Sequence, residues 1–256
     1  MSNDAIAIIP ARYGSTRFPG KLLARQTGKP LIQHVVEAVR QAKSIKRIIV
    51  ATDDKRIADA IAGSTAQSVL TRQDHPNGTS RIAEVVQNLP AQQQCPIIVN
   101  VQGDEPEIEP SVIDQLVSGL QSDPQVPMAT VASAFVEGED PTNPNIVKVV
   151  TDVRSRAIYF SRSLIPYDRG DSNVRPPLKH AGVYAYRRDF LLTYVALQPT
   201  ALEQTEQLEQ LRALEHGYPI AVIEADCRHH GIDTPQQYEE FVKRQKDVSR
   251  SARRID

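Results

Sequence analysis

The sequence lacks several features that would assign it to a protein class at once. It has no tryptophan and only two cysteines, Cys95 and Cys227, which are far apart and lack the spacing of a zinc site. Reduced, partly buried thiols are therefore expected rather than a disulfide or a metal site. No stretch approaches the roughly 20 apolar residues that span a bilayer. Because the first residues also lack the pattern of a secretory signal, we expect a cytoplasmic protein without a membrane partner.

An excess of charge of either sign is also missing. The 256 residues include 30 Lys and Arg against 31 Asp and Glu, which gives a formal net charge of −1. Proteins that bind nucleic acid usually have a basic field, so this composition predicts no nucleic-acid partner. The length and the 40% of hydrophobic residues are sufficient for one large core. We predict a single domain over residues 1–248, followed by a frayed tail over 249–256.

Apolar runs alternate with helical patterns over the first half of the chain. Runs that are apolar on both faces predict strands of a parallel sheet. They begin at Ala5, Arg47, Ser68, Pro96 and Pro127. Between them, apolar residues three and four positions apart predict helices. These begin at Pro30, Asp54, Ser80 and Pro110. The alternation predicts an α/β fold with an open, mostly parallel, Rossmann-like sheet that has helices on both faces.

The pattern changes after about residue 135. Short strand-like stretches, joined by a loop rich in Pro and Arg at 168–178, predict an inserted β lobe at about 136–187. The apolar stretches IVKVV and AIYF make this lobe a candidate surface for self-association. A helical stretch from Leu202, a strand from Pro219 and a last helix from Pro235 then return to the α/β pattern.

The stretch IIPARYGSTRFPGK follows the first predicted strand directly. Ligands of open parallel sheets bind beyond the carboxyl ends of the strands, so this loop stands at a favourable place. It contains two glycines, the hydroxyl groups of Ser15 and Thr16, and three cations, which together would suit a triphosphate. The spacing matches neither the dinucleotide fingerprint nor the Walker loop. The alternative is a solvated turn. The polar candidates are Arg12, Ser15, Arg17 and Lys21.

Two aspartates are candidates for holding a metal ion. Asp104 follows the apolar strand in VNVQGDEP, and Asp233 precedes the last helix in GIDTP. Carboxylates at such an edge can hold Mg²⁺, which prefers oxygen ligands and usually bridges them to substrate phosphates. The alternatives are a turn at Asp104 and a helix cap at Asp233, because Asp-Thr-Pro is a typical start of a helix. The residues alone leave both alternatives open.

Nine sequence blocks, in order and over nearly the whole chain, resemble the 3-deoxy-manno-octulosonate cytidylyltransferase family. They are IIPARYGSTRFPGK, RIIVATDD, TRQDHPNGTSRIAEV, VNVQGDEP, NPNIVKVV, YFSRSLIPYDR, HAGVYAYR, LEQLRALEHGY and GIDTPQQYE. The resemblance implies transfer of CMP from CTP to the anomeric hydroxyl of the acidic sugar 3-deoxy-manno-octulosonate (Kdo). It further implies release of pyrophosphate, a requirement for Mg²⁺, a role in lipopolysaccharide biosynthesis and a homodimer.

The resemblance also implies roles for individual residues. Lys21, Asp104 and Asp233 would be catalytic, and the two aspartates would bind the metal. The nucleotide would be bound by Arg12, Ser15, Lys21, Arg72, Gly78, Thr79 and Ser80. The sugar would be bound by Arg17, Gln102, His180, Tyr184, Glu209 and Gln210. We expect Arg17 and His180 to hold the sugar carboxylate, for which a planar guanidinium is well suited.

Two alternatives to this function stay open at the level of sequence. Ser80 stands where some relatives carry Glu, and the approach CRHHGIDTP to the last motif also differs from the family. The substrate could therefore be another 2-keto acid sugar, such as amino-Kdo or a sialic acid. Outside enzymes, a non-catalytic nucleotide-binding module could use the same fold.

Overall fold

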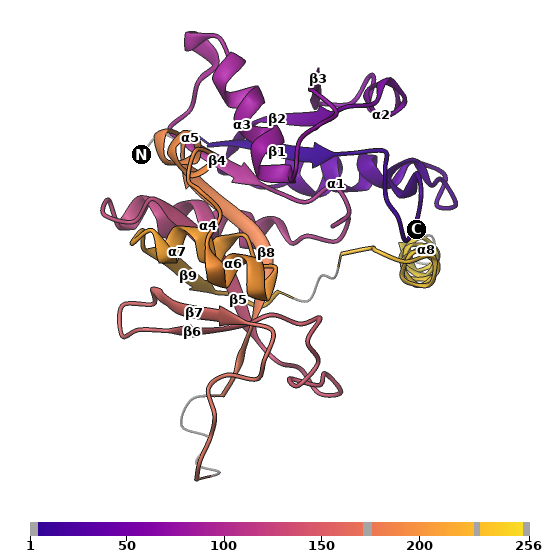
Figure 1. The fold of residues 1–256 in the computed structure, drawn as a ribbon. Coiled ribbons are helices and arrows are strands. Elements are labelled where there is room, and N and C mark those ends of the chain that lie inside the picture. Colours follow the sequence, from indigo (N-terminus) through magenta and orange to yellow (C-terminus); the bar gives the residue numbers. More distant parts are fainter. Residues whose placement is uncertain (1–4, 171–175, 228–230, 253–256) are drawn as a thin grey trace.

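A computed structural model describes residues 5–170, 176–227 and 231–252 of the protein. Within these ranges, nine strands form one sheet that is covered by helices on both faces (Figure 1). No helix in the described ranges is long and apolar enough to cross a membrane. The predicted α/β fold with a mostly parallel sheet is confirmed.

The main path of the sheet has the order β3-β2-β1-β4-β8-β5-β9. Its strands are β1 Ala5–Ala11, β2 Ile45–Thr52, β3 Gln67–Leu70, β4 Ile97–Asn100, β5 Met128–Ala134, β8 Leu178–Arg187 and β9 Ile220–Glu224. All neighbours on this path are parallel except β8, which lies antiparallel between β4 and β5. The carboxyl ends of β1 and β4 therefore meet at one edge, where the predicted phosphate loop begins.

The predicted β lobe is joined to the sheet more closely than its sequence suggested. Strands β6, Lys148–Thr151, and β7, Ala157–Ser161, form an antiparallel hairpin off the main path. The first part of β8 pairs with β6, whereas its last part pairs with β4. Figure 1 shows β8 running from the hairpin into the central sheet. A strand pattern does not encode its neighbours, so the sequence placed β8 in the lobe alone.

Helices cover the two faces of the sheet. They are α1 Leu31–Arg40, α2 Lys55–Ala60, α3 Gly78–Asn88, α4 Pro110–Ser122, α5 Arg188–Tyr194, α6 Ala201–Glu206, α7 Gln210–Glu215 and α8 Pro235–Ala252, with 3₁₀ turns at Lys21–Leu23 and Ala91–Gln93. Successive side chains of a strand point to opposite faces, so Ile8 and Ile9 enter different apolar clusters. One cluster packs against α1 and α4, and the other against α3 and α5.

The helices differ from the predicted pattern at two places. The helical stretch predicted from Leu202 is broken into α6 and α7, because Gln207 has left-handed backbone geometry with φ 53°. The break turns the start of α7 toward the carboxyl edge of the sheet. The last helix continues to Ala252, beyond residue 249 where the tail was predicted to begin, and 253–256 lie outside the described residues.

Candidate active site

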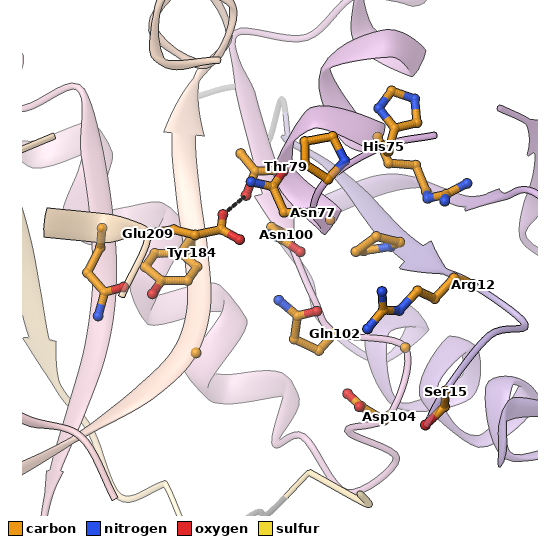
Figure 2. Close-up of a pocket in the computed structure, with 18 of the residues that line it drawn as sticks. Arg12, Ser15, His75, Asn77, Thr79, Asn100, Gln102, Asp104, Tyr184 and Glu209 are labelled. Atoms are coloured by element: carbon orange, nitrogen blue, oxygen red, sulfur yellow. Dashed lines mark hydrogen bonds between the residues drawn. The ribbon is translucent and has the colours of Figure 1, made fainter. Parts of the chain in front are cut away.

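A cavity of about 500 Å³ lies at the carboxyl edge of the sheet, beyond β1 and β4 (Figure 2). Loops and helix starts from distant parts of the chain meet there, as the topology of the sheet requires. The predicted site residues that line it are Arg12, Ser15, Arg17, Lys21, Gly78, Thr79, Gln102, Asp104, Tyr184, Glu209, Gln210 and Asp233. Their individual roles stay predictions. Arg72, Ser80 and His180 do not line this cavity.

The loop after β1 is fixed by contacts outside the cavity. Gly20 has φ 69°, and a Cβ there would lie 3.3 Å from the Tyr13 ring, so glycine is required on both grounds. The guanidinium of Arg56 lies 3.5 Å from the centre of the same ring and pairs with Asp54. Arg12 is exposed, and in the described ranges it forms no ion pair. The loop thus presents to the cavity the Arg12 guanidinium, which is suited to bind an anion.

Lys21 brings the two predicted metal ligands together. Its Nζ lies 2.5 Å from Asp104 Oδ2 and 3.0 Å from Asp233 Oδ1, and it also donates to the carbonyl of Ile232 at 2.9 Å. The second oxygen of Asp233 pairs with Arg17 at 2.9 Å. The Lys21 side chain is 11% exposed, so water screens these interactions less than on an open surface. Two cations and two carboxylates therefore meet at one wall of the cavity.

The helix cap at the start of α8 is made by another residue than Asp233. The backbone N–H of Gln237 donates to Thr234 Oγ1 at 3.3 Å, and the backbone N–H of Thr234 donates to Gln237 Oε1 at 3.0 Å. This reciprocal pair is a capping box. Both carboxylate oxygens of Asp233 are bound to cations instead. The geometry therefore favours the ligand interpretation of Asp233 over the capping one.

The start of α3 forms the opposite wall. Asn77 caps this helix by accepting from the Ser80 N–H at 2.8 Å. Gly78 lies against the Pro10 ring, where an added Cβ would be 3.0 Å from Cγ. Thr79 donates to Glu209 Oε2 at 3.1 Å, across to α7 (Figure 2). The wall is thus narrow at Gly78 and polar at Thr79.

Two residues predicted for this wall are held away from the cavity. Arg72 is exposed, and its backbone N–H and Nε both donate to Glu84. Ser80 donates its hydroxyl proton to the carbonyl of Asn77 at 2.9 Å. Both partners, Glu84 and Asn77, lie in the same sequence block, but the residue pattern does not show which side chains pair within it.

Sequence reasoning missed Arg81, which lines the cavity from α3 and is 3% exposed. Its guanidinium donates to Asp53 Oδ2 at 2.9 Å and to the carbonyl of Arg72 at 3.2 Å. The other oxygen of Asp53 accepts from the Tyr13 N–H at 3.4 Å. Asp53 and Arg81 therefore tie the phosphate loop to the opposite wall. Arg81 could have been found from the sequence, because it is a charged residue on the otherwise apolar face of a predicted helix.

Asn100 is a second cavity residue that the sequence reasoning passed over. It ends β4, is 1% exposed, and in the described ranges its Oδ1 has no hydrogen-bond partner. A buried polar group without a partner is unusual in a folded protein. The sequence feature that could have identified Asn100 is its place as a polar residue in an otherwise apolar run.

Three of the predicted sugar residues, His180, Tyr184 and Gln210, line an adjoining cavity of about 370 Å³, whereas Glu209 lines only the first. Tyr184 and Gln210 belong to both cavities, whereas His180 lines only this second one. Burial lowers the pKa of His180 to about 3 and raises the pKa of Tyr184 well above its usual value. Burial also raises the pKa of Glu209, against the opposing hydrogen bond from Thr79. Burial thus disfavours the charged forms of these three groups, although Glu105 and Lys179 also line the second cavity.

Comparisons with known proteins agree with this geometry. The family profile described as Cytidylyltransferase matches residues 6–224. The chain is 50% identical over 238 residues to the 3-deoxy-manno-octulosonate cytidylyltransferase of Syntrophotalea carbinolica, covering 90% of this chain and 94% of that one. It is 46% identical over 250 residues to the protein of the same name from Geobacter sulfurreducens, covering 94% and 98%.

A solved structure shows the same likeness. It is that of CMP:2-keto-3-deoxy-manno-octonic acid synthetase complexed with CTP, with a TM-score of 0.89 and 41% identity over 96% of this chain and 99% of that one. Fold, cavity and relatives thus agree on one assignment. The chain belongs to the cytidylyltransferase family, in the group of the 3-deoxy-manno-octulosonate cytidylyltransferases.

Proposed function

We propose that this protein transfers CMP from CTP to the anomeric hydroxyl of Kdo, giving CMP-Kdo and pyrophosphate. The observation that carries the proposal is the cluster of Lys21, Asp104 and Asp233 at the wall of a cavity that shares lining residues with a second, polar one. The names of the relatives and the CTP complex of the similar structure support the two substrates.

The reaction needs positioning and charge neutralisation more than a covalent nucleophile. The anomeric oxygen of Kdo forms a bond to the α-phosphorus, the bond from that phosphorus to the β-phosphate oxygen breaks, and the hydroxyl proton is released. Negative charge on the phosphates is stabilised by preorganised donors. Arg12, Ser15 and Lys21 line the cavity on the loop side and supply such donors. The sugar would be held by Arg17 of the same loop, by Gln102 after β4, and by residues of β8 and the start of α7.

The residues at this wall also fit a Mg²⁺ ion. Asp104 and Asp233 provide oxygen donors within reach of one Lys21 ammonium. In the described part of the chain no group of three or more His, Cys, Asp or Glu could hold a metal, and Mg²⁺ typically combines one or two carboxylates with substrate phosphates. When bound, the ion would neutralise charge on the phosphates.

A homodimer formed through the β lobe is part of the proposal. The lobe exposes large apolar side chains on β7 and its flanking loops, namely Val153, Ile158, Leu164 and Tyr167. Exposed apolar surface of this kind often marks an interface. Sedimentation at micromolar concentration should show a dimer, and a monomer across that range would refute it. A cytoplasmic location and a role in lipopolysaccharide biosynthesis fit CTP and Kdo as substrates.

A pyrophosphate-release assay tests the function. CTP, UTP, ATP and GTP are each combined with Kdo, amino-Kdo and sialic acid, with and without Mg²⁺. Release with CTP and Kdo that depends on both substrates is expected. Preference for another sugar acid would favour the related cytidylyltransferase alternative. CTP binding without release for any sugar would favour a nucleotide-binding module.

A further inference from the structure

Strands β5 and β8 lose their regular pairing next to the second cavity. Thr130 pairs with Tyr184 and Val131 with Ala181, so the register skips Gly182 and Val183. This bulge brings two carbonyl oxygens of β8 to one side chain of β5. Thr130 Oγ1 lies 2.8 Å from the carbonyl oxygen of Val183 and 3.2 Å from that of Ala181.

The same hydroxyl oxygen has a third neighbour, His180 Nε2 at 2.9 Å. A hydroxyl group has one proton to donate, and carbonyl oxygens only accept. If Thr130 donated to the imidazole, its oxygen would face two carbonyl oxygens with no proton between them. Its proton therefore goes to a carbonyl, and Oγ1 accepts from His180. This requires the proton of a neutral His180 ring to be on Nε2.

The other ring nitrogen, Nδ1, then carries a free electron pair. The low pKa of His180, about 3, keeps the ring neutral at physiological pH. Neighbouring rings fix its orientation: the centre of Phe160 lies 5.0 Å away in an edge contact, and that of Tyr184 lies 5.5 Å away. In the described residues no hydrogen bond involves Nδ1, and His180 lines the second cavity.

We propose that Thr130 is a positioning residue of the sugar site, which holds His180 as the Nε2–H tautomer so that Nδ1 accepts a hydrogen bond from a sugar hydroxyl. Thr130 is completely buried and lines neither cavity, so it can act on a sugar only through the residues that it contacts, and the side chain among these that lines the second cavity is His180. The sugar part of this inference rests on the proposed function. The tautomer itself does not.

The tautomer also changes which residue is expected to bind the sugar carboxylate. The free electron pair of Nδ1 repels the oxygen of a carboxylate. A sugar hydroxyl group, in contrast, can donate its proton to Nδ1. Arg17, which lines the first cavity, therefore remains the expected partner of the carboxylate. His180 would instead discriminate among sugar acids by their hydroxyl groups.

Nitrogen NMR of the full-length, ¹⁵N-histidine-labelled protein tests the tautomer without any variant of Thr130. The His180 signals are assigned by their loss in His180→Gln. We expect a protonated Nε2 and an unprotonated Nδ1, unchanged from pH 8 down to about pH 5, well above the pKa of about 3 of this buried ring. A ring protonated on Nδ1, alone or together with Nε2, would overturn the inference.

Kinetics of two Thr130 variants test its role toward the sugar. Thr130→Val removes the hydroxyl at nearly constant volume, and we expect the KM for Kdo to rise about tenfold, the value of one hydrogen bond, with the KM for CTP unchanged. Thr130→Ser keeps the hydroxyl and should restore the KM for Kdo. An equal rise for both substrates, or a Thr130→Ser enzyme as impaired as Thr130→Val, would indicate a structural role only and overturn the proposal.

Kdo analogues that each lack one hydroxyl identify the group that His180 binds. For one of them, wild type and Thr130→Val should have the same KM, because the hydrogen bond is already missing. If no analogue removes the difference, Nδ1 does not bind a sugar hydroxyl. If the wild type does not turn over Kdo at all, the proposed function and the sugar part fail together, while the NMR spectrum still decides the tautomer.

Discussion

Lys21 Nζ donates a hydrogen bond to Asp104 Oδ2 over 2.5 Å, although 83 positions separate the two residues in the chain. The same ammonium reaches Asp233 at 3.0 Å. Two carboxylates bound to one group would repel each other, and the shared cation offsets this repulsion. Lys21 thus holds the two carboxylates in place in the free protein.

Replacement of Lys21 should separate metal binding from turnover. Lys21→Met removes the cation that competes for the two carboxylates, so calorimetry should show tighter Mg²⁺ binding to the free protein. Turnover should nevertheless fall by a factor on the order of 10², because a donor to the phosphates is lost.

Lys29→Met serves as the matched control, since Lys29 pairs with Glu37 and does not line the cavity. Lys29→Met should leave both the Mg²⁺ affinity and the turnover unchanged. Unchanged Mg²⁺ affinity in Lys21→Met would mean that the carboxylates do not share one ion.

Gly78 should limit the size of the nucleotide base. In Gly78→Ala the new Cβ would lie 3.0 Å from Cγ of the rigid Pro10 ring, so the wall must shift. Overpacking of this kind costs about 1–3 kcal/mol, and we expect the KM for CTP to rise roughly tenfold. Gly170→Ala, where a Cβ meets nothing within 4 Å, is the control. Equal wild-type turnover of GTP and CTP would contradict a steric role of this wall.

His34 should make stability depend on pH. Burial, helped by Lys29, lowers its pKa from 6.5 to about 4. Between about pH 4 and pH 6.5, His34 is therefore protonated in the unfolded chain but not in the folded protein. The free energy of unfolding falls as the pH drops through this range. His34→Gln should reduce this slope by up to about 1.4 kcal/mol per pH unit.

Urea unfolding of both proteins at several pH values measures the slope. His180 contributes in the same direction, because its pKa is also lowered, so part of the slope should remain in the variant. Identical slopes in the two proteins would mean that His34 titrates normally in the folded state.

The site residues that could be predicted from the sequence are those that follow the carboxyl end of a predicted strand. Asp104 was found because it directly follows an apolar run, and Lys21 because it ends the loop after the first strand. Such positions depend on local pattern and on the general rule for open sheets.

The parts that sequence did not predict depend on side-chain contacts and strand pairings that the local pattern does not encode. Arg72 and Arg81 stand in one sequence block, yet only Arg81 reaches the cavity, because Asp53 pairs with it while Glu84 holds Arg72. The central place of β8 and the left-handed turn at Gln207 likewise follow from tertiary packing rather than from local pattern.

Asp104 and Asp233 decide whether the cavity is a metal-dependent transferase site. Asparagine keeps the shape of each side chain and removes its charge. Steady-state kinetics of Asp104→Asn and Asp233→Asn over a Mg²⁺ titration should show kcat lowered by a factor on the order of 10² or more in each variant, with CTP binding less affected.

Thr234→Ala is the matched control, because it removes the helix cap beside Asp233. It should lose about 1 kcal/mol of stability and keep a near-normal kcat. The most direct single measurement is the kcat of Asp233→Asn at saturating Mg²⁺. A loss on the order of 10² is the predicted result, and an enzyme with full activity would contradict the joint metal role of the two carboxylates.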